Sequence, residues 1–171
     1  MTRVLRKAES RRASKAPFAF SEQSLHRTLE LVFYAHMEMA DLANQVLAQH
    51  KLGRAHHRVL YFVVQQPGIT VNELISILRI TNQALSRTIN QLAQMQLIEQ
   101  KPGQQDRRHR CNYPTPKGIA LCRQLTALQY QHIDRSLAGV PREDLQVFWD
   151  VLLRMVREKD RAWITTSDQL K

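Results

Sequence analysis

Two short helix-forming stretches in the middle of the chain, separated by a few residues, constrain its fold more than any other feature. Thr70 and Glu73 have the T-x-x-E spacing of a capping box, which predicts a helix that begins at Val71 and ends near Arg79. Thr81 is a natural N-cap for a second helix immediately afterwards. Two helices joined by so short a turn indicate a helix-turn-helix unit.

The second helix has two chemically different faces. Its apolar side, expected to face the core, consists of Ala84, Leu85, Thr88, Ile89 and Leu92. Its other side carries amides, one hydroxyl and one arginine, namely Asn82, Gln83, Ser86, Arg87, Asn90 and Gln91. A merely solvated face would normally include acids, whereas Asn and Gln pair with adenine and Arg with guanine in the major groove of DNA. We interpret this as a DNA-reading helix whose contacts come from Thr81, Asn82, Gln83, Ser86, Arg87 and Asn90.

A basic hairpin is expected to follow that helix. The segments "LIEQK" and "RCNYP" are typical of short strands, and "PGQQDRRHR" lies between them at the tip. A hairpin in this place is a wing, and Arg107, Arg108 and Arg110 are expected to reach phosphates or a narrow minor groove. Asp106 is expected to accept hydrogen bonds from Arg108 and so orient it, because an acid beside phosphate is unfavourable.

Positive charge is abundant and uneven in this chain. The 171 residues have a formal net charge of +10, and the first 16 carry six Lys or Arg against one Glu. Such a balance favours polyanionic partners. We predict that residues 1–20 form a basic arm, which is either a disordered solubilising tail or a source of additional phosphate contacts.

Both ends of the chain are expected to be helical. Apolar residues at steps of three and four predict one helix over 21–50, roughly 45 Å long. Thr115 and Pro116 start another that runs to Leu137, and Pro141 starts the next. That last helix has an apolar stripe, expected to continue to the C-terminal region: Leu145, Phe148, Trp149, Leu152, Leu153, Val156, Trp163 and Ile164. Surplus apolar surface at both ends predicts a dimer interface.

These elements predict a mainly α fold with a small β-wing. A single domain over 21–165 would contain dimerisation helices at about 21–50 and 116–165 and a winged helix-turn-helix at about 54–115. Residues 166–171 would form a C-terminal tail.

Three stretches, "GITVNELISILRITNQALSRTINQLAQMQLIEQ", "QQDRRHR" and "TPKG", resemble the MarR family of winged-helix transcriptional regulators over about residues 25–160. The resemblance implies a homodimer that binds pseudo-palindromic operators, usually as a repressor, with Arg108 in the minor groove and Asp106 as its partner. Three positions depart from the family pattern. Gln96 replaces a common Gly, Gln100 a common Arg, and Pro114 a usual Leu, and the proline is expected to shorten the second wing strand.

The resemblance also implies a small-molecule effector. Family members often bind aromatic acids between the first helix, the "HHR" helix and the DNA-binding lobe. The candidate side chains here are Tyr34, His36, His56, His57, Arg58 and Tyr61. A His-His-Arg cluster beside aromatic rings would hold a hydroxybenzoate- or hydroxynicotinate-like carboxylate. The alternative is that these histidines are ordinary structural residues.

Other classes of function have weaker support. The chain has no metalloprotease motif, phosphate-cradling Gly-rich loop or nucleophile elbow, so we expect neither an enzyme nor a cofactor. The histidines lack convincing spacing for a metal site, and Cys111 and Cys122 are interpreted as packing residues. An architectural DNA-binding protein and a metal- or redox-responsive regulator remain alternatives. Two cysteines and no membrane-length apolar run predict a cytoplasmic protein.

Overall fold

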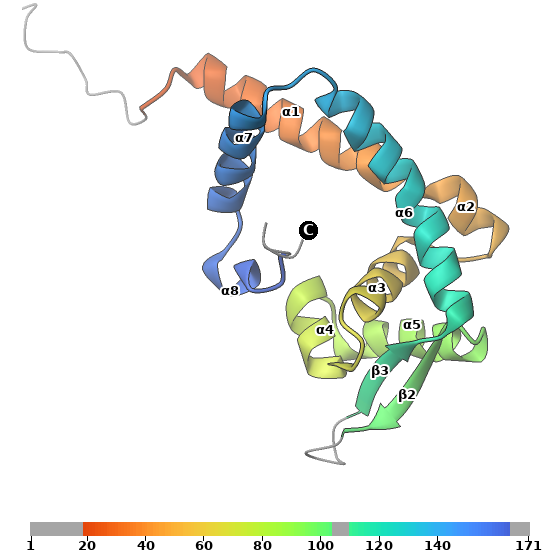
Figure 1. Ribbon diagram of the computed structural model, residues 1–171. Coiled ribbons are helices and arrows are strands. Elements are labelled where there is room, and N and C mark those ends of the chain that lie inside the picture. The colour runs from red at the N-terminus through yellow and green to blue at the C-terminus, as the bar shows by residue number, and fades with distance from the viewer. Residues whose placement is uncertain (1–18, 104–109, 165–171) are drawn as a thin grey trace, which may run out of the picture. The chain divides into compact units, whose positions relative to one another are not determined.

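The protein is mainly helical with a small antiparallel sheet, as the sequence predicts (Figure 1). The computed structural model describes residues 19–103 and 110–164. It comprises two units, 1–39 and 40–171.

The first unit contains most of α1 (Glu22–Asp41), none of whose residues is buried. The prediction of one helix to residue 50 is wrong, because α1 ends at Asp41 and α2 (Asn44–Gln49) begins after a two-residue turn. The Asp41 carboxylate accepts a hydrogen bond from Asn44 Nδ2 (2.8 Å) and forms an ion pair with Arg54. Side-chain bonds of this kind compete with continuation of a helix.

The core of the second unit is built around α3 (Arg54–Gln65). This helix contacts α4 (Val71–Leu78), α5 (Asn82–Gln94) and α6 (Pro116–Leu137). The large aliphatic side chains that are fully buried are Leu47, Leu60, Leu74, Leu85, Leu92, Leu97 and Leu125. Each such leucine stabilises the fold by about 1.5–3 kcal/mol relative to an exposed one. The core therefore fixes the two helices of the helix-turn-helix unit, α4 and α5, against α3.

Three strands form the sheet, in the order β1 (Ile69–Thr70), β3 (Arg110–Pro114) and β2 (Ile98–Pro102). The short β1 was not expected from the sequence. Pro114 does not shorten the hairpin, and that prediction is wrong: it is the last residue of β3 and pairs with Ile98. A proline is tolerated at this end because β1 pairs only with Cys111 and Asn112, so no ladder needs an N–H from it.

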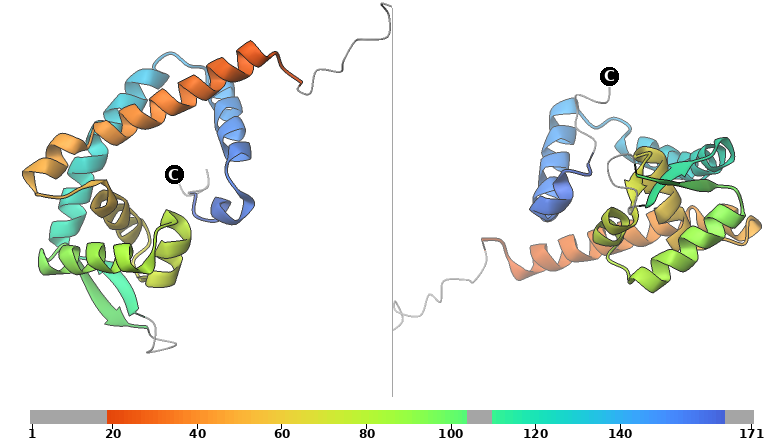
Figure 2. Two further views of the ribbon diagram at one scale, coloured as in Figure 1. Left: turned by 180° about the vertical axis from the view of Figure 1, so that it is seen from behind. Right: turned by 90° about the horizontal axis from the view of Figure 1, so that it is seen from below.

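A fully buried asparagine holds the three strands together. Asn112 Nδ2 donates to the carbonyl oxygen of Ile69 in β1 (2.9 Å), and Gln100 Nε2 of β2 donates to Asn112 Oδ1 (3.1 Å). Because both polar atoms of the amide are bonded, its burial carries no unsatisfied group. Figure 2 shows the resulting hairpin beside α5, which contacts β2.

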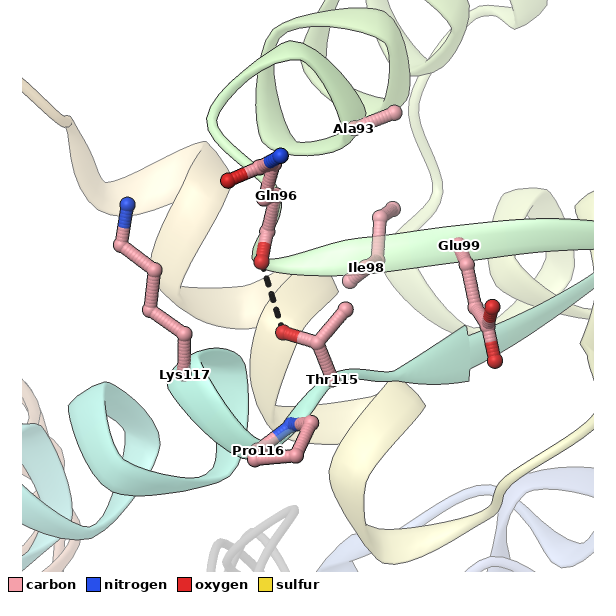
Figure 3. A pocket seen from close by; sticks show the side chains of 7 residues that line it. All are labelled: Ala93, Gln96, Ile98, Glu99, Thr115, Pro116 and Lys117. Atoms are coloured by element: carbon pink, nitrogen blue, oxygen red, sulfur yellow. Dashed lines mark hydrogen bonds between the residues drawn. The ribbon is translucent and has the colours of Figure 1, made fainter.

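The start of α6 is fitted closely to the end of α5. Gln96 adopts φ 58°, a left-handed conformation, and its carbonyl oxygen accepts a hydrogen bond from Thr115 Oγ1 (2.7 Å; Figure 3). Thr115 also caps α6, and Lys117 Nζ donates to the Met95 carbonyl (3.0 Å). A Cβ atom on Gly118 would lie 1.9 Å from the Leu97 carbonyl oxygen, so only glycine fits there. These contacts explain the "TPKG" sequence.

The chain ends with α7 (Arg142–Met155) and α8 (Glu158–Arg161). Gly139 follows α6 with φ 80°, and Pro141 precedes α7, as predicted. The apolar stripe does not continue to Ile164, and that prediction is wrong, because α7 ends at Met155 and the backbone turns before α8. Trp163 instead lies half-buried against the core of the second unit.

Candidate nucleic-acid interface

The polar face of α5 is exposed along its length. Its accessible side chains are Thr81, Asn82, Gln83, Ser86, Arg87, Asn90 and Gln91. On the opposite side Leu85, Thr88, Ile89 and Leu92 are buried, as predicted, whereas Ala84 is exposed and its assignment to the core face is wrong. Ala84 lies in the first turn of α5, where its backbone N–H donates to the hydroxyl of the N-cap Thr81 (3.2 Å). In this first turn the Ala84 side chain does not reach the core.

Local hydrogen bonds orient part of this face. Ser86 Oγ donates to Asn82 Oδ1 (3.2 Å), which leaves the two N–H groups of the Asn82 amide available. Thr88 Oγ1 donates to the Ala84 carbonyl oxygen (3.0 Å), so the buried hydroxyl is satisfied within α5. The helix therefore presents amide donors and one guanidinium to solvent while its buried side is fully packed.

A histidine ties α5 to the start of α3. His56 Nδ1 accepts a hydrogen bond from the Gly53 N–H (3.1 Å), so Nε2 carries the proton and donates to Gln91 Oε1 (2.8 Å). The sequence predicts that His56 binds an effector, whereas in the structure both of its ring nitrogens have partners inside the protein. The G-x-x-H spacing at a helix start is a signal for the bond to Gly53, whereas no local pattern indicates the bond to Gln91.

The wing is described up to its tip. Arg110 is exposed at the start of β3, opposite Pro102. Asp106, Arg107 and Arg108 lie in residues 104–109, outside the described part of the chain. Lys101 Nζ lies 2.6 Å from Glu99 Oε1 and 5.2 Å from the ring centre of Tyr113. The charge of Lys101 is thus paired within β2, and Arg110 adds an exposed positive charge at the start of β3.

The remaining effector candidates are divided between the two units. Tyr34 and His36 belong to the first unit. His57, Arg58 and Tyr61 lie on α3, where Arg58 is exposed and the other two are half-buried. His57 and Tyr61 are four residues apart and share one face of the helix.

His57 is the candidate with unused hydrogen-bonding capacity. Its Nε2 atom is buried and has no hydrogen-bond partner in the part of the chain that the structure describes. Burial lowers the pKa of His57 and therefore keeps the ring neutral. Burial also raises the pKa of Tyr61, with further contributions from Tyr130 and Cys122.

Both thiols of the described chain are at least partly shielded from solvent. Burial raises the pKa of Cys122 to about 11, so it stays protonated at neutral pH, and Cys111 is half-buried in β3. Within residues 19–103 and 110–164, no three His, Cys, Asp or Glu side chains are grouped to hold a metal ion. None of the helices described there is long and apolar enough to cross a membrane.

An open hollow of about 620 Å³ lies at the junction of α5, β2 and α6 (Figure 3). It is lined by Ala93, Gln96, Ile98, Glu99, Thr115, Pro116 and Lys117. The polar ends of Lys117 and Thr115 already donate to backbone carbonyl groups. None of the effector candidates lines it, so we assign this hollow no ligand.

Helices α4 and α5, followed by the β2–β3 hairpin, define a winged helix-turn-helix DNA-binding protein. A family model described as "MarR family" matches residues 50–109. The chain is also similar to the HTH-type transcriptional regulator PetP of Rhodobacter capsulatus, with 37% identity over 136 residues, which covers 80% of this chain and 82% of that protein. The chain belongs to the MarR family of transcriptional regulators, which are DNA-binding proteins and not enzymes.

Solved structures share its fold. A MarR-family regulator from Listeria monocytogenes in complex with a 26mer DNA has a TM-score of 0.65 at 20% identity, covering 74% of this chain and 85% of that one. Apo MarR of E. coli has a TM-score of 0.58 at 22% identity, covering 75% and 95% respectively. The structure of the regulator SlyA has a TM-score of 0.65 at 18% identity, covering 80% and 96%.

Proposed function

We propose that this regulator is a homodimeric repressor that recognises a pseudo-palindromic operator with α5 and the wing. The acid-free, exposed face of α5 carries this proposal. The proposed contacts with DNA come from two elements. From α5 they are made by Thr81, Asn82, Gln83, Ser86, Arg87 and Asn90, and from the wing by Arg107, Arg108 and Arg110. Asp106 orients Arg108, and the basic arm over residues 1–20 adds phosphate contacts. The site of action is the cytoplasm.

Dimerisation is supported by the exposed apolar surface of α7. The large apolar residues of α7 that are exposed are Val147, Phe148, Trp149, Val151, Leu152, Leu153 and Met155. A second copy would cover such a surface and place two α5 helices at successive major grooves. The Listeria regulator that is similar in fold was solved with DNA, which agrees with this use of the same architecture. In the proposed domain, residues 21–50 and 116–165 dimerise and 54–115 bind DNA.

The test of sequence recognition is a selection followed by competition. Random duplexes are bound to the protein, recovered and amplified until a sequence is enriched, and its affinity is compared with that of a scrambled duplex. A repressor with base-reading residues prefers the enriched duplex by at least about a thousandfold. Equal competition by both duplexes would instead establish the alternative, an architectural DNA-binding protein.

The effector proposal rests on the unsatisfied Nε2 atom of His57. We propose that a small aromatic acid, hydroxybenzoate- or hydroxynicotinate-like, bonds there beside Tyr61, with Arg58 of the same helix as a further member of the site. At 100 times its dissociation constant a ligand stabilises the native state by about 2.7 kcal/mol, which a thermal-shift measurement detects. His57→Ala should abolish the shift, while His50→Ala, at an exposed histidine, should retain it. A shift that both variants retain would move the site away from α3.

A further inference from the structure

One ion pair joins the C-terminal segment to the helix-turn-helix unit. An Nη2 group of Arg79 donates to Asp160 Oδ2. The two residues are 81 positions apart in sequence, and the pair connects the end of α4 to α8 within the second unit (Figure 1). The Asp160 side chain is only 16% exposed, and Arg157 Nε lies 3.6 Å from the same oxygen.

Arg79 occupies an unusual backbone position. It is the C-cap of α4 and adopts the left-handed conformation, with φ 55° and ψ 43°. Glycine is the usual residue after a helix because a side chain in this conformation costs about 1 kcal/mol or more. An arginine at this position lacks the conformational freedom of glycine. Its side chain instead provides the contact with Asp160.

This contact lies close to the start of the reading helix. Only Ile80 and the N-cap Thr81 separate Arg79 from the first residue of α5. The direction of α5 therefore depends on the conformation of this short turn, and base-reading side chains need to be held to within about half an ångström.

Asp160, the other partner of this ion pair, lies in a short helix that closely follows α7, the proposed dimerisation helix. Val156 and Arg157 alone connect α7 to α8. Trp163, just beyond α8, packs half-buried against the core, and its backbone N–H donates to the Asp160 carbonyl (3.2 Å). Asp160 is thus held in place by the segment that follows α7.

We propose that Asp160 is a positioning residue for operator recognition: it holds Arg79, and with it the turn that directs α5, so that the packing of α7 and α8 controls sequence-specific affinity. This inference rests on the proposed function, because it requires α5 to read bases. It assigns to the C-terminal segment a role in DNA reading in addition to dimerisation.

The test measures affinity for the enriched duplex and for its scrambled counterpart with Asp160→Asn, Arg79→Gly and the double variant. Asp160→Asn should weaken binding to the enriched duplex by about fivefold to thirtyfold and leave the scrambled duplex unweakened. Removal of this carboxylate raises the formal net charge from +10 to +11, which alone would strengthen binding to any duplex. The expected loss therefore has the opposite sign to a simple charge effect.

Arg79→Gly keeps the experiment decisive if Asp160→Asn folds poorly. Glycine adopts the left-handed C-cap freely, so this variant removes the ion pair without strain in α4. It should show the same selective loss, and the double variant should be no worse than either single one, because both remove one interaction. Glu158→Gln makes the same charge change in the same short helix and should bind both duplexes at least as tightly as the wild type does.

Three results would overturn the proposal. The first is wild-type affinity of Arg79→Gly for the enriched duplex. The second is an equal loss on both duplexes for Arg79→Gly, with a salt slope reduced by about 1, which would make Arg79 a phosphate contact. The third is a double variant whose loss is the product of the single losses. If the wild type enriches no sequence at all, the proposed function itself fails, and this inference fails with it.

Discussion

Two amphipathic helices of nearly equal length, α5 and α7, have opposite relations to the core. Helix α5 has 13 residues, and its leucines Leu85 and Leu92 are 0% exposed. Helix α7 has 14 residues and none of them is buried, with Phe148 and Trp149 49% and 43% exposed. The apolar side of α5 is thus buried within the chain and its polar side is exposed, whereas the described part of the chain leaves the apolar side of α7 uncovered.

The largest expected effect tests the buried side of α5. Leu92→Ala should lower the free energy of unfolding by about 3 kcal/mol, because it leaves a cavity in the core beside α3. Urea denaturation measures the loss, which should not depend on protein concentration. A loss under 1 kcal/mol would mean that α5 is not anchored as the structure places it.

The next effect tests the exposed side of α7. Trp149→Asp should weaken dimerisation by about 2 kcal/mol, which is the scale of an aromatic residue at the centre of an interface. Sedimentation at several concentrations measures the change, and Asp144→Asn, at an acid in the first turn of α7, serves as the control. An unchanged dimer, or a wild type that is monomeric throughout, would remove the contrast between the two helices.

Base reading by α5 should show an effect of similar or smaller size. Arg87→Ala should lose about 1–3 kcal/mol of discrimination at one base pair in each half-site, because the proposed bidentate contact with a base would be lost. Binding to duplexes with single substitutions maps the affected position. The unfolding free energy should remain at the wild-type value, since Arg87 is exposed. A uniform loss over all sequences would identify a phosphate contact instead.

The smallest expected effect lies just beyond the C-terminal end of α5. Gln96→Gly should stabilise the fold by about 0.5–1 kcal/mol, because a glycine adopts φ 58° without the penalty that a side chain incurs. Gln94→Gly, within the helix, should destabilise it instead. Thermal unfolding of the two variants side by side checks the opposite signs. Destabilisation by both would show that the Gln96 side chain contributes more than its backbone strain costs.

The features that were predicted correctly from the sequence depend on residues close together in the chain. The caps at Thr70, Thr81 and Thr115 each require only residues within one turn of a helix, and all three form as expected. The polar and buried sides of α5 follow from the helical period in the same way, except for Ala84.

The features that the sequence did not predict depend on contacts between residues far apart in the chain. The end of α1 depends on Arg54, which is 13 positions from Asp41. The role of His56 depends on Gln91, 35 positions away, and no periodicity in either helix indicates that pair. Strand β1 has only two residues and exists because Asn112 and Cys111 lie opposite them. The tip of the wing and the effector site remain predictions.

Because Gly118 packs tightly against Leu97, a change in orientation at the start of α6 would be transmitted along the helix. This helix has 22 residues, so it is about 33 Å long, and it is seated at one end where no side chain has room. A tilt of about 5° at that seat would displace the other end by about 3 Å over such a length. A small tilt of α6 beside the wing would therefore become an ångström-scale displacement where α7 begins.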